Sequence, residues 1–106
     1  MDNQELLFQV KRKLNITWED DVTTARIQEI IASAIPDLKH KLGIVDVDFD
    51  FSVAGAENTL FLNYCLYEWN HAIAEFDLNY ERLIAQVRAK YEVANFMAQG
   101  DEDAES

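Results

Sequence analysis

The sequence predicts an all-α fold, and three observations carry that prediction. The chain has 106 residues, of which 49 % are hydrophobic, so it can bury one core but is too short for two. Only three Gly and one Pro interrupt it, which leaves few positions for tight turns. Apolar residues recur three or four positions apart over most of its length. We therefore expect a single helical domain over residues 1–98 and an acidic, flexible tail over residues 99–106.

Two amphipathic runs predict the first two helices. The first helix can be capped by Asp2 and ends in a basic turn, where cations suit the helix dipole. The second covers the run "RIQEIIASAIPDLKHKLG", in which Gly43 is a suitable C-terminal cap. Pro36 removes a backbone hydrogen bond inside that run, so we expect a kink or a break just before it.

Three consecutive carboxylates, Glu19 to Asp21, stand at the start of the predicted second helix. They could ligate a metal, take part in acid–base chemistry or contact a partner, but they also suit a helix start. Thr17 can serve as N-cap with Asp20 as the acid of a capping box, and the helix dipole favours negative charge there. Metal ligation needs further converging oxygen atoms, which the sequence does not identify. We prefer the helix start, with Trp18 stapling the turn onto the fold; an exposed Trp18 would instead be a candidate contact.

Between residues 44 and 55 the pattern changes to the period of two that is typical of a strand. No second strand is predicted to pair with it, so we expect an extended arm between the second and third helices. The arm could fold back on its own core or dock on another subunit. Its apolar members are Val45, Val47, Phe49 and Phe51, and its acidic members, expected on the surface, are Asp46, Asp48 and Asp50.

A third helix is predicted over roughly residues 57–76, and it is apolar on two faces. Such a helix is either central or in contact with a neighbouring subunit. A fourth helix follows to Gly100, which makes four helices in all. One face of the third helix holds Leu62, Cys65, Leu66, Trp69, Ala72, Ile73 and Phe76, and the second holds Leu60, Tyr64, Tyr67 and His71.

Catalytic and metal-binding motifs find little support. Glu68 and His71 form a Glu-x-x-His pair of the kind used in di-iron helical proteins, echoed by Asp37 and His40. The pair points away from the predicted core, so surface residues are the better interpretation. No Gly-rich phosphate loop, nucleophile elbow or zinc-type cysteine pair occurs, and the single Cys65 lies in an apolar run typical of a reduced core thiol. We expect no enzyme, cofactor or metal.

The formal net charge of −11 argues against binding of a phosphate backbone, which depends on Lys and Arg contacts. It favours solubility, a basic partner or a surface that does not adhere to DNA. The sequence shows neither a signal segment nor an apolar run of membrane-spanning length, so we expect the chain to be made in the cytoplasm.

The order of these features resembles the small head-tail connector proteins, also called adaptor or head-completion proteins, of tailed bacteriophages and prophages. The resemblance runs from about Leu6 to Met97 and includes "KLNITWEDDVTTARIQEIIASAIPDLKHKLGI" and the link "DFDFS". Its most specific part is "ENTLFLNYCLYEWNHA" with the later "YEVANF". Pro36 has no counterpart in the family pattern.

The resemblance implies a four-helix connector-type subunit that is not an enzyme and has no cofactor. Such subunits form a homo-oligomeric ring, usually twelvefold, under the portal vertex of the virion. The ring continues the DNA channel without binding DNA specifically, and it joins the head to the next neck or tail-completion protein. Before assembly the subunit would lie in the host cytoplasm, where it could exist as a monomer, because ring surfaces are often completed only on their template.

On this interpretation, contacts with neighbouring subunits or with the portal protein are predicted for Val45, Val47, Phe49, Phe51, Tyr64, Tyr67 and His71. A ring subunit must meet a neighbour on each side, which suits a helix with two apolar faces and an unpaired arm. The alternative from another class is a small acidic regulatory protein, antitoxin-like or DNA-mimicking, that covers a basic partner.

Overall fold

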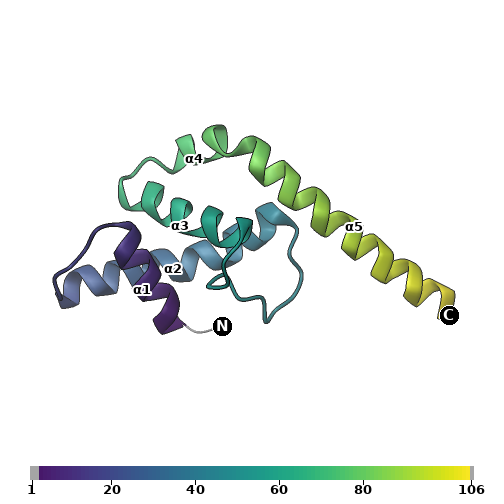
Figure 1. The fold of residues 1–106 in the computed structure, drawn as a ribbon, viewed down its shortest axis with the longest axis horizontal. Coiled ribbons are helices and arrows are strands. Elements are labelled where there is room, and N and C mark those ends of the chain that lie inside the picture. The colour runs from purple at the N-terminus through teal and green to yellow at the C-terminus, as the bar shows by residue number, and fades with distance from the viewer. Residues whose placement is uncertain (1–2, 106) are drawn as a thin grey trace.

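The computed structural model describes the backbone of residues 3–105 and the side chains of residues 4–97. Within these residues it is all-helical, as predicted, with no strand (Figure 1). The described helices number five rather than the predicted four, because the expected third helix is divided into two. They are α1 (Asn3–Lys13), α2 (Asp21–Leu42), α3 (Ala56–Trp69), α4 (Ile73–Asn79) and α5 (Glu81–Glu105). The predicted cap Asp2 lies outside the described residues.

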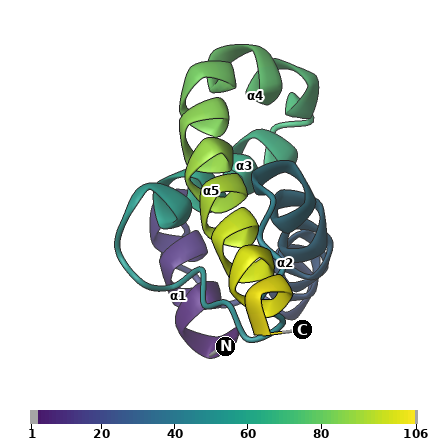
Figure 2. The ribbon, with the colours of Figure 1, turned by 90° about the vertical axis from the view of Figure 1, so that its right-hand side faces the viewer.

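The helices form a packed body from which one helix projects. α1, α2 and α3 pack on one another, and α4 reverses the chain so that α5 runs back over α3 and α2 (Figures 1 and 2). The C-terminal end of α5 continues beyond the body, and the subunit measures 55 × 28 × 20 Å. Because of this elongation, the C-terminal end of α5 lies away from the packed body of α1, α2 and α3.

The core lies between α2 and its neighbours. The apolar face of α2 is buried from Ile27 to Leu42, in the register that the sequence predicts. It meets the apolar sides of α1 and α3, and one aromatic ring from the loop between α2 and α3. The buried residues on α2 are Ile27, Ile30, Ile31, Ala34, Leu38 and Leu42, and those that meet them include Leu6, Val10, Phe51, Leu60, Phe61 and Cys65.

Three helices end with the same left-handed cap. Asn15 after α1, Gly43 after α2 and His71 after α3 have φ values of 59°, 71° and 57°. In each case the next amide donates to the carbonyl five positions earlier, at 2.8 to 3.0 Å. The cap at His71 ends α3 at Trp69, so the prediction of one helix to Phe76 is wrong. Histidine is among the few side chains enriched in this left-handed region.

The start of α2 is capped by Asp20 and not by Thr17. The Asp20 carboxylate accepts hydrogen bonds from the Thr23 hydroxyl at 2.7 Å and from the Thr23 amide at 3.2 Å. These bonds, the hydroxyl's first, lower the pKa of Asp20. The helix therefore begins three residues later than the predicted capping box. Asp is as competent an N-cap as Thr, and Thr23, the third helical residue after Asp20, supplies the donors.

α2 runs through Pro36 from Asp21 to Leu42, so no break occurs there, and the kink that was the other predicted outcome stays a prediction. The Pro36 ring is exposed, while residues on the opposite face of the helix are buried. Burial of that face stabilises the helix enough to accept the lost hydrogen bond.

α5 also exceeds its predicted end. It passes Gly100 and continues to Glu105, because a single glycine weakens a helix without stopping it. The side chains of residues 98–106 lie outside the described part of the chain, and the prediction of a flexible tail over residues 99–106 stays a prediction.

Candidate interaction surfaces

The loop between α2 and α3 is a series of turns and not the extended arm that the alternating pattern predicts. The Asp46 carboxylate accepts a hydrogen bond from the Asp48 amide at 2.9 Å. The Asp50 carboxylate accepts bonds from the Ser52 hydroxyl at 2.6 Å and from the Ser52 amide at 2.9 Å, which lower the pKa of Asp50. Aspartate side chains bond readily to the backbone two residues on, so the same residues that mimic strand alternation bend the chain.

Side chains from three helices hold this loop against the body. Gln9 of α1 donates to the carbonyl of Ser52 at 2.9 Å, and Asn58 of α3 donates to the carbonyl of Phe51 at 2.8 Å. The Lys39 ammonium of α2 donates to two carbonyls in the first half of the loop, at 2.8 and 3.3 Å. The loop thus has partners inside its own subunit.

The four apolar loop residues that were predicted as contacts divide into two pairs. Phe51 is fully buried, with its ring stacked 5.0 Å from that of Phe61, and the half-buried Phe49 meets Phe51 edge-on at 4.9 Å. Val45 and Val47 are 76 % and 84 % exposed. Phe49 and Phe51 therefore pack back on the chain's own core, which was one of the two predicted alternatives. The two valines are exposed to solvent, and their predicted contact with a neighbouring subunit stays a prediction.

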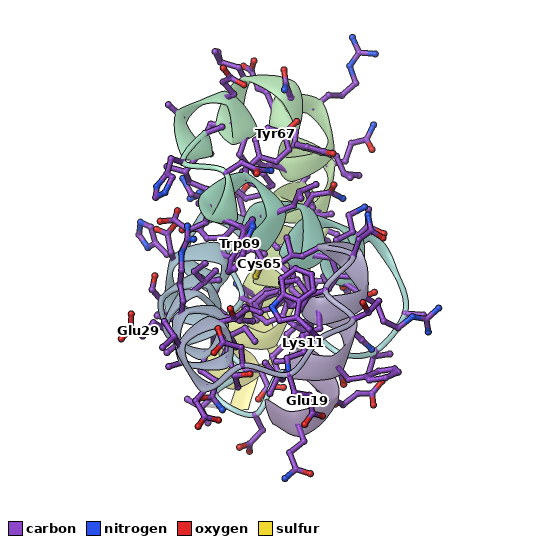
Figure 3. All side chains as sticks on the ribbon, turned by 90° about the vertical axis from the view of Figure 1, so that its left-hand side faces the viewer. Lys11, Glu19, Glu29, Cys65, Tyr67 and Trp69 are labelled. Atoms are coloured by element: carbon purple, nitrogen blue, oxygen red, sulfur yellow. The ribbon has the colours of Figure 1, made fainter. Side chains whose placement is uncertain are left out.

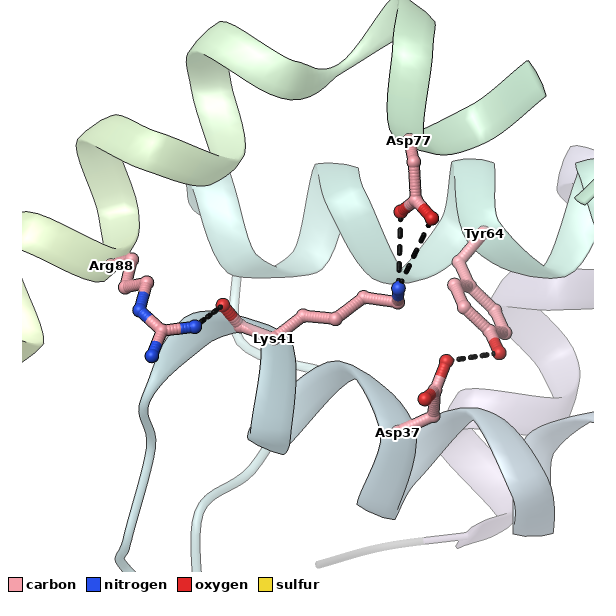
Figure 4. Close-up of polar contacts among 5 residues, drawn as sticks. All are labelled: Asp37, Lys41, Tyr64, Asp77 and Arg88. Atoms are coloured by element: carbon pink, nitrogen blue, oxygen red, sulfur yellow. Dashed lines mark hydrogen bonds and ion pairs between the residues drawn. The ribbon is translucent and has the colours of Figure 1, made fainter. Parts of the chain in front are cut away.

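The second apolar face of α3 turns toward the subunit's own helices. Tyr64 is buried, and its hydroxyl donates to the Asp37 carboxylate of α2 at 2.6 Å (Figure 4). Burial, with the adjacent carboxylate, raises the pKa of Tyr64. Tyr67 is half-buried where α3 meets α4, with its ring edge-on to Phe76 at 5.9 Å and its hydroxyl accepting a bond from Asn79 at 2.9 Å (Figure 3). α3 has two apolar faces because it is central.

The corner between α3 and α4 depends on Arg26 of α2, which sequence reasoning missed. Its guanidinium lies 4.2 Å from the Trp69 ring centroid and donates to the Trp69 carbonyl at 2.8 Å. It also lies 3.3 Å from Nε2 of the exposed His71. Arg26 thus satisfies a carbonyl at the end of α3. The sequence feature that could have pointed to this role is that Arg26 is the only cation in the first half of α2, where the other residues are uncharged or acidic.

Glu68 and His71 line a hollow of about 270 Å³, but Arg26 lines it too. A guanidinium beside these groups opposes the binding of a cation. Asp37 of the echoing pair bonds to Tyr64 instead. Among the described residues, no group of three or more His, Cys, Asp or Glu side chains converges.

Cys65 is a buried free thiol, as predicted. It lies inside the body between α2 and α3 (Figure 3). Burial raises its pKa to about 12, with a smaller effect from Glu68. A thiol in this state is a poor nucleophile, because the thiolate is the reactive form.

Polar contacts fix the direction of α5. The Lys41 ammonium pairs with the Asp77 carboxylate of α4 at 3.1 Å, and Arg88 of α5 donates to the Lys41 carbonyl at 3.2 Å (Figure 4). Further along, the Tyr91 hydroxyl donates to Glu57 at the start of α3, at 2.7 Å. These bonds hold α5 on the body, and its later residues extend past it.

One side of α5 packs on the body and the opposite side is apolar and open. Residues that face the body recur at helical spacing and end with Asn95, whose amide donates to the Gly43 carbonyl at 3.2 Å. The far side carries what we term the α5 stripe, defined as Ala89, Val93, Phe96 and Met97. Val93, Phe96 and Met97 are 59 %, 75 % and 63 % exposed. An amphipathic surface helix normally places polar residues there.

Trp18 is exposed rather than stapled onto the fold, since α2 begins later than predicted and leaves Trp18 in the loop before it. Because its ring is exposed, Trp18 becomes a candidate contact residue. Phe8 on α1 is also exposed, with the Arg12 guanidinium 5.7 Å from its ring centroid. Large apolar side chains thus reach solvent on α1, before α2 and at the end of α5.

Comparison of the chain with protein-family models, with curated proteins and with solved structures gives no match. Among the described residues, none of the helices has both the length and the apolar character needed to span a membrane.

Proposed function

We propose that this chain is a structural subunit of a ring at the head-tail junction of a tailed bacteriophage or prophage, and that it performs no catalysis. In this role the ring lies under the portal vertex in the virion, continues the DNA channel and offers a surface to the next neck or tail-completion protein. The sequence resemblance suggested this role, and the observation that carries it is the outward apolar face of α5.

A ring subunit must present two surfaces to its neighbours. The α5 stripe lies on the side of α5 that faces away from the body, and the subunit's own fold does not cover it. Exposed apolar side chains grouped on one helix face are typical of an association surface. The contact set proposed here therefore differs from the predicted one. It omits Phe51 and Tyr64, which are buried in their own subunit, and keeps Val45 and Val47 as candidates.

The charge supports a channel through which DNA slides. With a net charge of −11, the subunit repels phosphates over distances of about 10 Å at moderate ionic strength. Asp46 and Asp48 of the loop are exposed and add to this acidic surface, while Asp50 is half-buried. Repulsion keeps DNA from adhering to a wall that it must pass.

Purified tailed particles test the proposal. Mass spectrometry of the particles should find this chain in a fixed ratio to the portal protein, and cryo-electron microscopy should place it between head and tail. Particles from a strain lacking the gene should contain heads and tails that are not joined. Joined, infectious particles that lack the chain would contradict the proposal.

The acidic surface also suits the second candidate, a regulatory protein that covers a basic partner. In that case the chain would be recovered from cell extracts with a basic protein and would be missing from particles. Portal, capsid and tail genes beside its own gene would favour the ring subunit, and a neighbouring toxin or nuclease gene would favour the regulator.

A further inference from the structure

We infer that the end of α5 docks on α1 of a second copy of this chain, in a head-to-tail contact. The inference rests on the ring function proposed above, which it deepens by naming the two surfaces that meet. The donor surface is the α5 stripe with the acidic residues that follow it in sequence. The acceptor is the α1 patch, defined as Phe8, Lys11, Arg12 and Lys13.

The donor surface combines apolar side chains with negative charge. The α5 stripe is exposed on the side of the helix that faces away from the body. Beyond it the sequence carries four carboxylic acids and no cation before the chain ends, namely Asp101, Glu102, Asp103 and Glu105.

The α1 patch has the complementary character. Phe8 is 56 % exposed, and the only run of three consecutive cations in this acidic chain follows it. Among the described residues, none of the three cations forms an ion pair. Arg12 and Lys13 also line a hollow of about 320 Å³ together with Leu62, so cationic and apolar groups lie side by side there.

The two surfaces cannot meet within one subunit. α1 lies toward one end of the long axis and the C-terminal end of α5 lies at the other, in a molecule 55 Å long (Figure 1). The occupant of each surface is therefore the complementary surface of another copy. A contact between unlike surfaces leaves one of each free, so it propagates to a ring where the rotation closes.

Photo-cross-linking tests this contact in the full-length chain. A chain with p-benzoylphenylalanine in place of Phe96 is mixed with unmodified chain labelled with ¹⁵N and irradiated. We expect a cross-linked dimer in which the labelled tryptic peptide contains Phe8. The matched control carries the same group in place of Leu78 on α4, which is as exposed as Phe96, and it should not label α1. Labelling of another region, or no dimer, would overturn the inference.

Charge reversal separates this contact from non-specific adhesion. The labelled chain with Lys11→Glu, Arg12→Glu and Lys13→Glu should lose the cross-link, and the photoreactive chain with Asp101→Lys, Glu102→Lys and Asp103→Lys should restore it. A cross-link that is indifferent to both changes would overturn the inference. A chain found in the virion neck whose cross-link maps elsewhere leaves the ring function standing and removes this contact. A cross-link at α1 from a chain that is absent from particles keeps the contact and removes the ring function.

Discussion

α2 and α5 are of similar length, 22 and 25 residues, but they use their apolar residues in opposite ways. α2 buries six of them on one face between Ile27 and Leu42. α5 packs one side on the body as far as Asn95 and turns Val93, Phe96 and Met97 on its other side toward solvent. The burial of α2 accounts for the stability of the subunit. The outward face of α5 has no such role within one subunit, so we assign it to association.

Two phenylalanines provide the strongest test of this difference. Phe51→Ala should lower the free energy of unfolding by about 3 to 5 kcal/mol, because it leaves a cavity beside Phe61 in the core. Phe96→Ala removes the same atoms from a solvent-exposed site and should change that free energy by less than about 0.5 kcal/mol. Urea unfolding of both variants measures the difference. Equal losses would show that the end of α5 belongs to the core.

Arg26 allows a second test within the body, at the corner that the sequence did not reveal. Arg26→Ala should lower the free energy of unfolding by about 2 kcal/mol, since it removes both the stacking on Trp69 and the bond to the Trp69 carbonyl. Arg82→Ala on α5 is the matched control, because Arg82 is exposed, and it should have little effect. Comparable losses at the two arginines would mean that net charge, and not the corner, determines the effect.

The contact between α5 and α3 is smaller and depends on pH. Partial burial opposes ionisation of Glu57, but the hydrogen bonds from Tyr91 and Lys90 outweigh it and lower the pKa of Glu57. A lowered pKa in the folded chain stabilises the fold fully above the unfolded value of about 4.3 and progressively less as the pH falls through the folded value.

Tyr91→Phe should therefore cost about 1 kcal/mol at neutral pH and less in acid. Urea unfolding at a series of pH values measures this cost. The variant Glu19→Gln serves as the control for general charge effects, because Glu19 is exposed and lies outside the contact between α5 and α3. A cost for Tyr91→Phe that does not change with pH would contradict the assignment of the bond to the ionised Glu57.

The smallest effect is expected at the start of α2. Asp20→Ala should speed hydrogen exchange at the Thr23 amide and slightly reduce stability, because it removes the carboxylate that accepts from that amide. The effect should fade as the pH falls through the lowered pKa of Asp20. Thr17→Ala should leave the exchange unchanged. Faster exchange in the Thr17→Ala variant, with no change in the Asp20→Ala variant, would show that Thr17 is the N-cap of α2.

The fold class and most of the buried face of α2 could be predicted from the sequence, since helical periodicity reports directly which side of a helix is apolar. The division of α3 from α4 could not, because it needs a left-handed His71 and the guanidinium of Arg26 from another helix. The helical spacing of apolar residues continues across this corner, so the sequence pattern alone predicts one uninterrupted helix.

The candidate contact residues were harder to predict. Val45 and Phe51 have the same place in the alternating pattern, yet one is exposed and the other buried. Side-chain bonds of Asp46 and Asp50 bend the loop and thereby decide between them. The outward face of α5 could not be predicted, because helical periodicity shows which residues share a face but not how far the rest of the fold extends to cover that face.

Sedimentation velocity of the full-length chain over a concentration series tests most directly whether α5 is an association surface. We predict that the unmodified chain forms oligomers as its concentration rises. The variant with Val93→Ser and Phe96→Ser should remain monomeric while keeping the same free energy of unfolding. Equal association of both chains, or a monomer at every concentration of the unmodified chain, would contradict the account.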